Sequence, residues 1–196
     1  MVLQTLLNWG GCDIIKGMKQ VIVKCRLKSP QEFERKLNEI EMNFGPVYWL
    51  HDRVYVPRNY QRHSSYPRLI LRTEMRAVDK PAKYVLILRR HVEDSGVDIV
   101  NRTIVNDYAE AANIVMQLGF KPQAELSFQR REIVMSEGTV MYLDKIEGKE
   151  GYFAKLEADL DENNDKVSDV IDDLERTFRV LGQDRSTVVR DAYAEL

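Results

Sequence analysis

The stretch RLILRTEMR, residues 68–76, carries three arginines at a spacing that can place them on one side of the chain. Alternate side chains of a strand point to opposite faces, so Arg68, Arg72 and Arg76 share a face if this segment is a strand. The guanidinium group is planar, and its geometry matches two oxygens of a phosphate group. These arginines therefore suit the binding of a large anion.

Charged side chains recur on one face of most other expected strands: Lys24 and Arg26; Arg89; Gln129 and Arg131; Lys155 and Glu157. In one interpretation these are solvated outer faces of a sandwich, because half-exposed strands are common. In the other, the cations point into the lumen of a barrel, where buried charges need anionic partners. Periodicity alone leaves both interpretations open.

The elements that must position these residues are many strands and few helices. The sequence predicts helices over 30–44, 107–118 and 165–182, and strands over 19–27, 47–56, 68–76, 82–90, 97–105, 124–135, 138–146 and 151–160. Ser29 and Glu32 form a capping box for the first helix, and Gly45 is expected to end it. The order strand, helix, strand, strand, strand occurs twice. We expect an α+β fold with either an antiparallel barrel or a strongly curved sheet, and with helices packed outside.

Composition sets broad limits on the protein class. The chain has 196 residues, a net charge of −2 and two cysteines, Cys12 and Cys25. These values favour one globular domain in a reducing, cytoplasmic environment, with nucleic acid an unlikely partner. No apolar run is long enough to span a membrane as a helix. Residues 1–17 show no convincing pattern, and we interpret them as an extension before a domain at 18–196.

Several motifs together resemble the CYTH superfamily, whose fold is the triphosphate tunnel. The best stretch is YLDKIEGKEGYFAKLEADL, residues 142–160, which keeps Leu143, Asp144, Gly151, Phe153 and Glu157. The ending DAYAEL also resembles the family's last segment. The group includes class IV adenylate cyclases, thiamine triphosphatases and inorganic triphosphatases. The resemblance implies a barrel whose tunnel is lined by ionic residues.

Most departures from the family pattern replace a carboxylate rather than a cation. The resemblance finds cations retained at phosphate-binding positions: Lys24, Arg72, Arg89 and Arg131. We expect two further cations to contact the phosphates, Arg68 on the face of Arg72 and Lys155, which stands in place of a family Glu. Carboxylates of the family are mostly lost, since Gln20 and Ile22 stand where its first strand has Glu. Arg102 and Lys155 occupy two further acidic positions. Glu157 is the one acidic residue that the resemblance leaves as a metal ligand.

Two functions remain open from these residues. The first is a triphosphate phosphohydrolase or class IV adenylate cyclase, which would use Mg²⁺ or Mn²⁺ held by oxygen ligands. The second is a catalytically depleted module that binds a triphosphate, a polyphosphate or a nucleotide without turnover and without a metal. In both functions only the phosphate groups of the ligand can be inferred from the sequence, so the organic part of the ligand stays open. The oligomeric state stays open as well.

Overall fold

The computed structural model describes residues 18–61, 66–92, 97–136, 138–161, 165–189 and 193. Its described elements are β1 (Met18–Arg26), α1 (Pro30–Glu39), β2 (Tyr48–Pro57), β3 (Arg68–Met75), β4 (Lys83–Val92), β5 (Val97–Val105), α2 (Tyr108–Gln117), β6 (Phe120–Ser136), β7 (Thr139–Ile146), β8 (Phe153–Asp159), α3 (Val167–Val180) and a 3₁₀ turn (Arg185–Thr187). The predicted extension over 1–17 lies outside the described residues. Within them, no helix combines the length and the apolar character that crossing a membrane requires.

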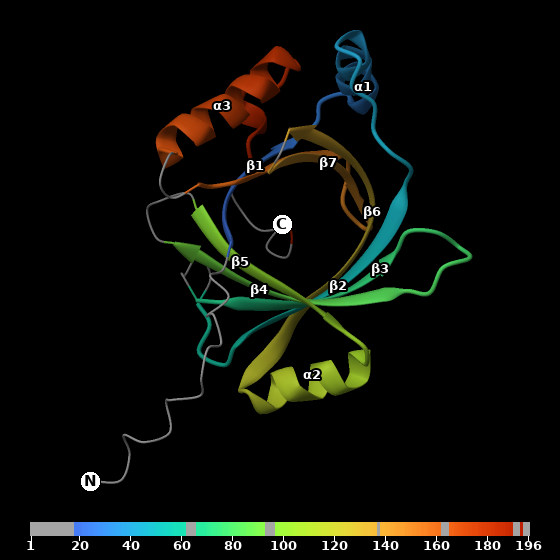
Figure 1. Cartoon of the computed structure of the whole chain (residues 1–196), viewed down its shortest axis with the longest axis vertical. Helices are drawn as coiled ribbons and strands as arrows, with labels where there is room; N and C mark the ends of the chain where they lie inside the picture. The colour runs from blue at the N-terminus through green and yellow to red at the C-terminus, as the bar shows by residue number, and fades with distance from the viewer. Residues whose placement is uncertain are drawn as a thin grey trace.

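The strands form a closed antiparallel barrel in the order β1-β5-β4-β3-β2-β6-β7-β8 (Figure 1). β1 closes the barrel because it pairs with β5 on one side and with β8 on the other. The series β1, α1, β2, β3, β4 is followed by β5, α2, β6, β7, β8, so the predicted repeat of element order is confirmed. The predicted fold class, a barrel with outer helices, is confirmed as well.

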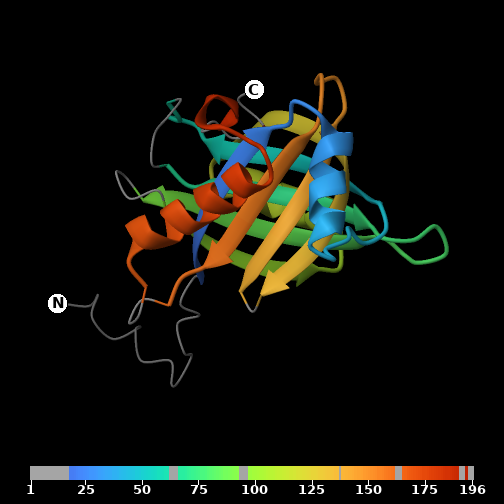
Figure 2. The ribbon, with the colours of Figure 1, turned by 90° about the horizontal axis from the view of Figure 1, so that it is seen from above.

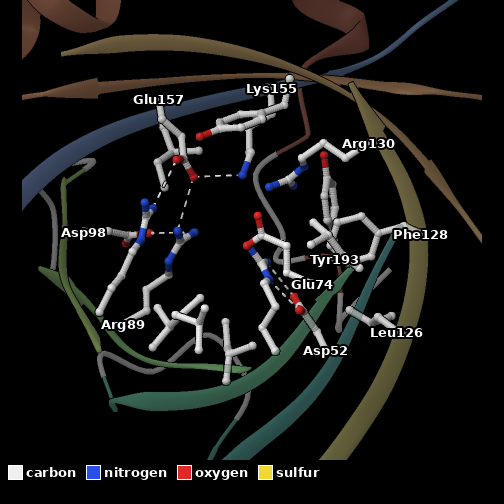
Figure 3. Close-up of a pocket in the computed structure, with 18 of the residues that line it drawn as sticks. Asp52, Glu74, Arg89, Asp98, Leu126, Phe128, Arg130, Lys155, Glu157 and Tyr193 are labelled. Atoms are coloured by element: carbon white, nitrogen blue, oxygen red, sulfur yellow. Dashed lines mark hydrogen bonds and ion pairs between the residues drawn. The ribbon is translucent and has the colours of Figure 1, made fainter. Parts of the chain in front are cut away.

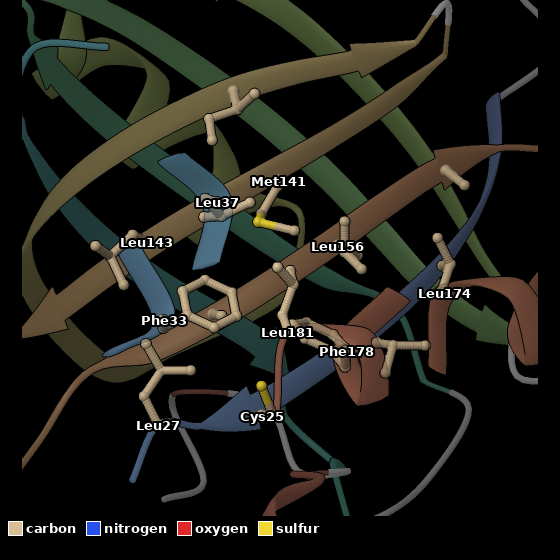
Figure 4. Packing of buried hydrophobic residues seen from close by; sticks show 14 of the residues in the cluster. Cys25, Leu27, Phe33, Leu37, Met141, Leu143, Leu156, Leu174, Phe178 and Leu181 are labelled. Carbon is tan, nitrogen blue, oxygen red and sulfur yellow. The ribbon is translucent and has the colours of Figure 1, made fainter. Parts of the chain in front are cut away.

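The largest apolar core lies outside the barrel, between the strands and two helices. α1 and α3 cross the outer face formed by β1, β7 and β8 (Figures 2 and 4). Phe33 of α1 and Phe178 of α3 meet there with ring centroids 6.5 Å apart. Met141 and Leu156 of the strands are fully buried beneath them. This packing uses the apolar face of each strand and turns the alternate, charged face towards the lumen.

The helix predicted over 30–44 ends earlier, at Glu39. Ser29 caps its start by accepting a hydrogen bond from the backbone N–H of Glu32, as expected. The chain then turns through Glu41, whose φ is 60°, so Gly45 is not the residue that ends the helix. Beyond the turn Phe44 packs against the outer core from an irregular segment, which explains the apolar periodicity that continued past the helix.

α2 covers the other side of the barrel, against β3 and β6 (Figure 1). Asp107 caps its N-terminus by accepting a hydrogen bond from the N–H of Glu110. Gly119 follows its last turn with φ 91°, a conformation that glycine adopts without the steric cost of a Cβ. The outer surface is therefore covered by helices on two sides, and the inner surface is left to the alternate strand faces.

Candidate anion-binding site

The barrel encloses a cavity of about 1230 Å³, with lining side chains from all eight strands (Figure 3). The face of β3 that carries Arg68, Arg72 and Arg76 is among them, together with Ile70 and Glu74. The prediction that this face turns into the lumen is confirmed, and the sandwich interpretation is wrong. The opposite face of β3 packs outward, with Leu69 and Leu71 in the core beneath α2.

Most of the cations predicted from the sequence meet in this cavity. Lys24 of β1, Arg68 and Arg72 of β3, Arg89 of β4 and Lys155 of β8 all line it, as does Arg102 of β5. Glu157 lies among them. Their binding of phosphate stays a proposal, because their position alone does not identify a ligand.

Arg131 is a correction to the predicted set. Its side chain lies on the outer face of β6, where its guanidinium is 2.6 Å from the carboxylate of Glu34 on α1 and stacks over the Phe44 ring. The neighbouring Arg130 lines the cavity instead. A shift of one residue along a strand moves every side chain to the other face. The sequence has two adjacent arginines here, and the prediction placed Arg131 in the cavity instead of Arg130.

Two arginines in the wall of the cavity each hold a carboxylate through two of their three guanidinium nitrogens. Arg130 donates to Asp144 at 2.6 and 2.8 Å, and only 4% of the arginine side chain is exposed. Arg72 donates to Asp52 with two bonds of 2.7 Å. Burial alone would lower the pKa of both arginines, but the carboxylates outweigh it and raise that pKa. Both arginines are therefore permanent positive charges in the wall of the cavity.

Glu157 is surrounded by three cations. Its carboxylate is 2.8 Å from Nζ of Lys155 and 3.3 Å from guanidinium nitrogens of both Arg89 and Arg102. Burial would raise the pKa of Glu157, but these three positive charges dominate and hold that pKa well below its ordinary value. Glu157 is therefore ionised at neutral pH and acts as the internal counterion of the three cations.

Lys155 is a cation whose pKa is lowered by its surroundings. Burial lowers the pKa of its ammonium group to about 7, and the positive charge of Arg130 acts in the same direction. Its Nζ also lies 4.5 Å from the centre of the Tyr142 ring. A lysine with this pKa loses much of its charge just above neutral pH, so any anion that binds beside it will favour its protonated form.

The donor set does not fit a divalent metal. Mg²⁺ and Mn²⁺ need several oxygen ligands, and the described residues contain no cluster of three or more Asp, Glu, His or Cys arranged to hold one. Glu157 faces three cations, while Asp52 and Asp144 each engage an arginine through both oxygens. A cation placed at Glu157 would be repelled by Lys155, Arg89 and Arg102. The predicted metal role of Glu157 is therefore not supported by its surroundings.

Tyr193 fills one part of the lumen. Its ring lies 5.5 Å from that of Phe153 and 6.3 Å from that of Phe128, and Nζ of Lys24 is 5.4 Å from its centre (Figure 3). Val189 donates its backbone N–H to the carbonyl of Lys24, which ties this last segment to β1. The resemblance of DAYAEL to the family's ending pointed to this segment, but gave Tyr193 no role.

Several lining residues were not anticipated as members of the site. Glu132 accepts from Arg76 at 2.8 Å and from the hydroxyl of Tyr48, which builds a second charged group away from Glu157. Lys80 and Lys83 contribute exposed positive charge from the end of the β3–β4 hairpin. Period-two patterning of 124–135 could have found Glu132 together with Arg130, since the two residues share a face.

Comparison with known proteins places this geometry in a family. The sequence model of the CYTH domain matches residues 18–193. No curated protein matches the chain in sequence. A conserved hypothetical protein of Pyrococcus furiosus has a similar structure, with a TM-score of 0.71 and 22% identity over 90% of this chain and 99% of that one.

Two further similar structures belong to proteins whose names mention an enzyme activity. A putative adenylate cyclase of Vibrio parahaemolyticus gives a TM-score of 0.74 at 16% identity, over 91% of this chain and 97% of that one. A putative adenylyl cyclase of Hippeastrum, described as having dominant triphosphatase activity, gives 0.53 at 16% identity, over 84% and 88%. At these identities the likeness shows the fold alone.

Proposed function

This chain belongs to the CYTH domain family, and from that premise we propose that its barrel binds a triphosphate, a polyphosphate or a nucleotide through the phosphate groups. The proposal rests on the excess of basic over acidic side chains in the lining of the cavity. Among the described residues, ten Lys or Arg side chains line the cavity against six Asp or Glu side chains. Like charges held together destabilise the empty barrel, so an anion in the cavity stabilises the fold.

Binding without a divalent metal is the form of this function that the residues favour. In the family pattern, carboxylates beside the phosphate site hold the metal. Here Lys155 and Arg102 stand at two of those positions and contact Glu157 instead. Their charges can neutralise phosphate oxygens directly. Arg89 adds a guanidinium whose Nε is buried and has no hydrogen-bond partner among the described residues, so it is able to donate to a bound anion.

The second candidate is a metal-dependent enzyme, a triphosphate phosphohydrolase or a class IV adenylate cyclase. The activity in the name of the Hippeastrum protein favours it. The two candidates make opposite demands on Glu157. An enzyme needs this carboxylate for its metal, whereas a metal-free binder uses it as a counterion that an anion must displace.

Thermal unfolding with tripolyphosphate in EDTA at low salt tests the proposal. We expect the melting temperature to rise without Mg²⁺ and the rise to shrink as salt screens the charges. Arg72→Ala should reduce the rise, because a charge-assisted bond to phosphate is lost. Arg131→Ala is the matched control, since that arginine also pairs with a carboxylate but lies outside the cavity.

Two results would contradict this proposal in different ways. The absence of any tripolyphosphate effect at low salt would remove the anion site altogether. Binding that appears only with Mg²⁺ or Mn²⁺, together with release of phosphate, would instead establish the enzyme. Measuring phosphate release in the same samples separates the two.

A further inference from the structure

The lining of the cavity is not charged throughout. Val54 of β2, Ile70 of β3 and Ile87 of β4 lie directly opposite one another in the strand register, and Val85 follows on the same face of β4. We call these four residues the apolar band. Ile70, Val85 and Ile87 pack with Val100 of β5 into one cluster, and Val85 and Ile87 are only 7% and 4% exposed. The band is therefore a fixed wall rather than a set of mobile side chains.

Lys155 and Glu157 lie across the lumen from the apolar band, whereas Arg102 and Arg72 border the band, since they lie directly opposite Ile87 and Val85 in the strand register. In the strand order of the closed barrel, β3 is opposite β8 and β4 is opposite β7. Lys155 and Glu157 enter the cavity from β8, and Arg130 enters from β6 next to β7 (Figure 3). A ligand that reaches across the cavity from Lys155 would meet hydrocarbon at Ile70 and Ile87.

An inorganic polyphosphate is poorly matched to such a cavity. Its oxygens are charged along the whole chain, and each needs a donor or water. The aliphatic wall offers neither. The volume of about 1230 Å³ also exceeds that of most small-molecule sites, which leaves space beside the phosphates for an organic group. The cavity thus offers an apolar patch for an organic group beside the cations that suit an anion.

The polarity of the band also discriminates between kinds of organic group. A nucleobase presents donors and acceptors around its edge, and these lose hydrogen bonds when they are placed against aliphatic side chains. The band itself holds no donor, no acceptor and no aromatic ring for stacking. A hydrocarbon group loses nothing there and gains from leaving water.

We propose that the ligand of this cavity is the diphosphate or triphosphate ester of an apolar alcohol, with the phosphates beside Lys155 and Arg130 and the hydrocarbon against the apolar band. This inference rests on the proposed function and names the class of its ligand. The excess of basic over acidic side chains among the described lining residues suits an anionic ligand such as a diphosphate or triphosphate ester. Recognition then requires both a phosphate end and a hydrocarbon end.

Isothermal titration in EDTA at low salt tests this inference with four probes: pyrophosphate, tripolyphosphate, ATP and geranyl diphosphate. We expect geranyl diphosphate to bind at least about tenfold more tightly than pyrophosphate, because its chain is buried on the apolar band. We also expect it to bind more tightly than ATP.

Substitution of the band provides the matched test. In the double variant Val54→Thr with Val85→Thr, shape is nearly kept while two hydroxyls enter the wall. The advantage of geranyl diphosphate over pyrophosphate should shrink several-fold, while tripolyphosphate affinity stays near that of the parent protein and reports that the cavity is intact. Val134→Thr is the control, since Val134 is 72% exposed on β6.

The outcomes distinguish a failure of this inference from a failure of the proposed function. Tripolyphosphate binding with no preference for geranyl diphosphate over pyrophosphate would overturn the inference and leave the proposed function standing. Tighter binding of ATP than of geranyl diphosphate would overturn it in favour of a nucleotide. An unchanged preference in the double variant would show that the hydrocarbon lies elsewhere. If none of the four probes binds, the proposed function falls as well.

Discussion

Lys155 and Glu157 lie two residues apart on β8, both face the cavity, and the lysine Nζ is 2.8 Å from a carboxylate oxygen of the glutamate. The family pattern has two carboxylates at this spacing. The exchange of one of them for lysine converts a pair that attracts a metal into a pair that neutralises itself. Arg89 and Arg102 then complete the neutralisation of Glu157 from β4 and β5.

Replacing Glu157 with Gln should strengthen metal-free binding of tripolyphosphate. The carboxylate competes with the ligand for Lys155, Arg89 and Arg102, so its removal frees these cations for phosphate. We expect affinity to rise about tenfold in titration calorimetry. The empty variant should unfold at lower urea concentration, because three buried or half-buried cations lose their counterion.

The matched control for this experiment is Glu34→Gln, which removes the carboxylate that pairs with Arg131 outside the barrel. It should leave tripolyphosphate affinity unchanged. Weaker binding by Glu157→Gln would indicate that the carboxylate serves the ligand rather than competing with it, as the metal-dependent enzyme requires.

The pH dependence of binding should report Lys155. Burial lowers its pKa to about 7, so above neutral pH the empty protein must take up a proton when an anion binds beside this residue. Affinity for tripolyphosphate should therefore fall between pH 7.5 and 9.5, by up to about tenfold per pH unit. Tripolyphosphate itself gains a negative charge in this range, so the measured quantity is the difference from Lys155→Met, which meets the same ligand. Lys155→Met should bind more weakly and lose most of the pH dependence.

The stability of the empty protein should change with pH in the opposite direction. In the unfolded chain Lys155 keeps its proton up to the ordinary value of 10.5, so from pH 7 to 10 the unfolded state binds more protons at this residue. The free energy of unfolding, relative to that of Lys155→Met, should therefore rise with pH across this range. A flat difference between the two proteins would show that Lys155 titrates normally.

Two adjacent arginines of β6 should respond differently to the same change. Arg130→Met leaves the fully buried Asp144 without its partner, which should cost roughly 3–5 kcal/mol in urea unfolding. Arg131→Met removes a half-exposed contact with Glu34 and should cost about 1 kcal/mol or less. Equal costs would place both side chains in similar surroundings and would contradict the register of β6.

Removal of residues 1–17 should leave the melting temperature almost unchanged. β1 begins at Met18, the barrel closes without any earlier residue, and the family match also begins at residue 18. Thermal unfolding of the shortened chain checks this expectation. A loss of several degrees would mean that the first 17 residues pack on the domain.

Local patterns of the sequence were sufficient to predict the elements. Period-two alternation identified each strand within a few residues, and the cap residues Ser29 and Asp107 placed the starts of two helices. The one-sided charges were compatible with a sandwich and with a barrel, and the resemblance to the CYTH superfamily favoured the barrel. The end of α1 was missed, since the apolar spacing continued through a turn that is stabilised by tertiary contacts.

The details of the site could not be predicted from the sequence of any single strand. β6 has Arg130 and Arg131 side by side, and the face of each is fixed by pairing with β2 and β7 rather than by its own sequence. The enclosure of Glu157 likewise requires Arg89 and Arg102 to approach from two other strands. Such partners are distant along the chain, and their approach follows from the closed barrel.

The position of β1 between β5 and β8 has a consequence for how the chain acquires its structure. β1 is synthesised before the other described strands, yet its partners are β5 and β8. The hydrogen bond from Gln20 to Asp159 joins residues 139 positions apart. A nascent chain that ends before Phe153 therefore has an unpaired edge on β1 and no continuous wall around the lumen. Closure of the barrel is a late, non-local step, of the kind that makes folding slow and leaves strand edges exposed to other chains in the meantime.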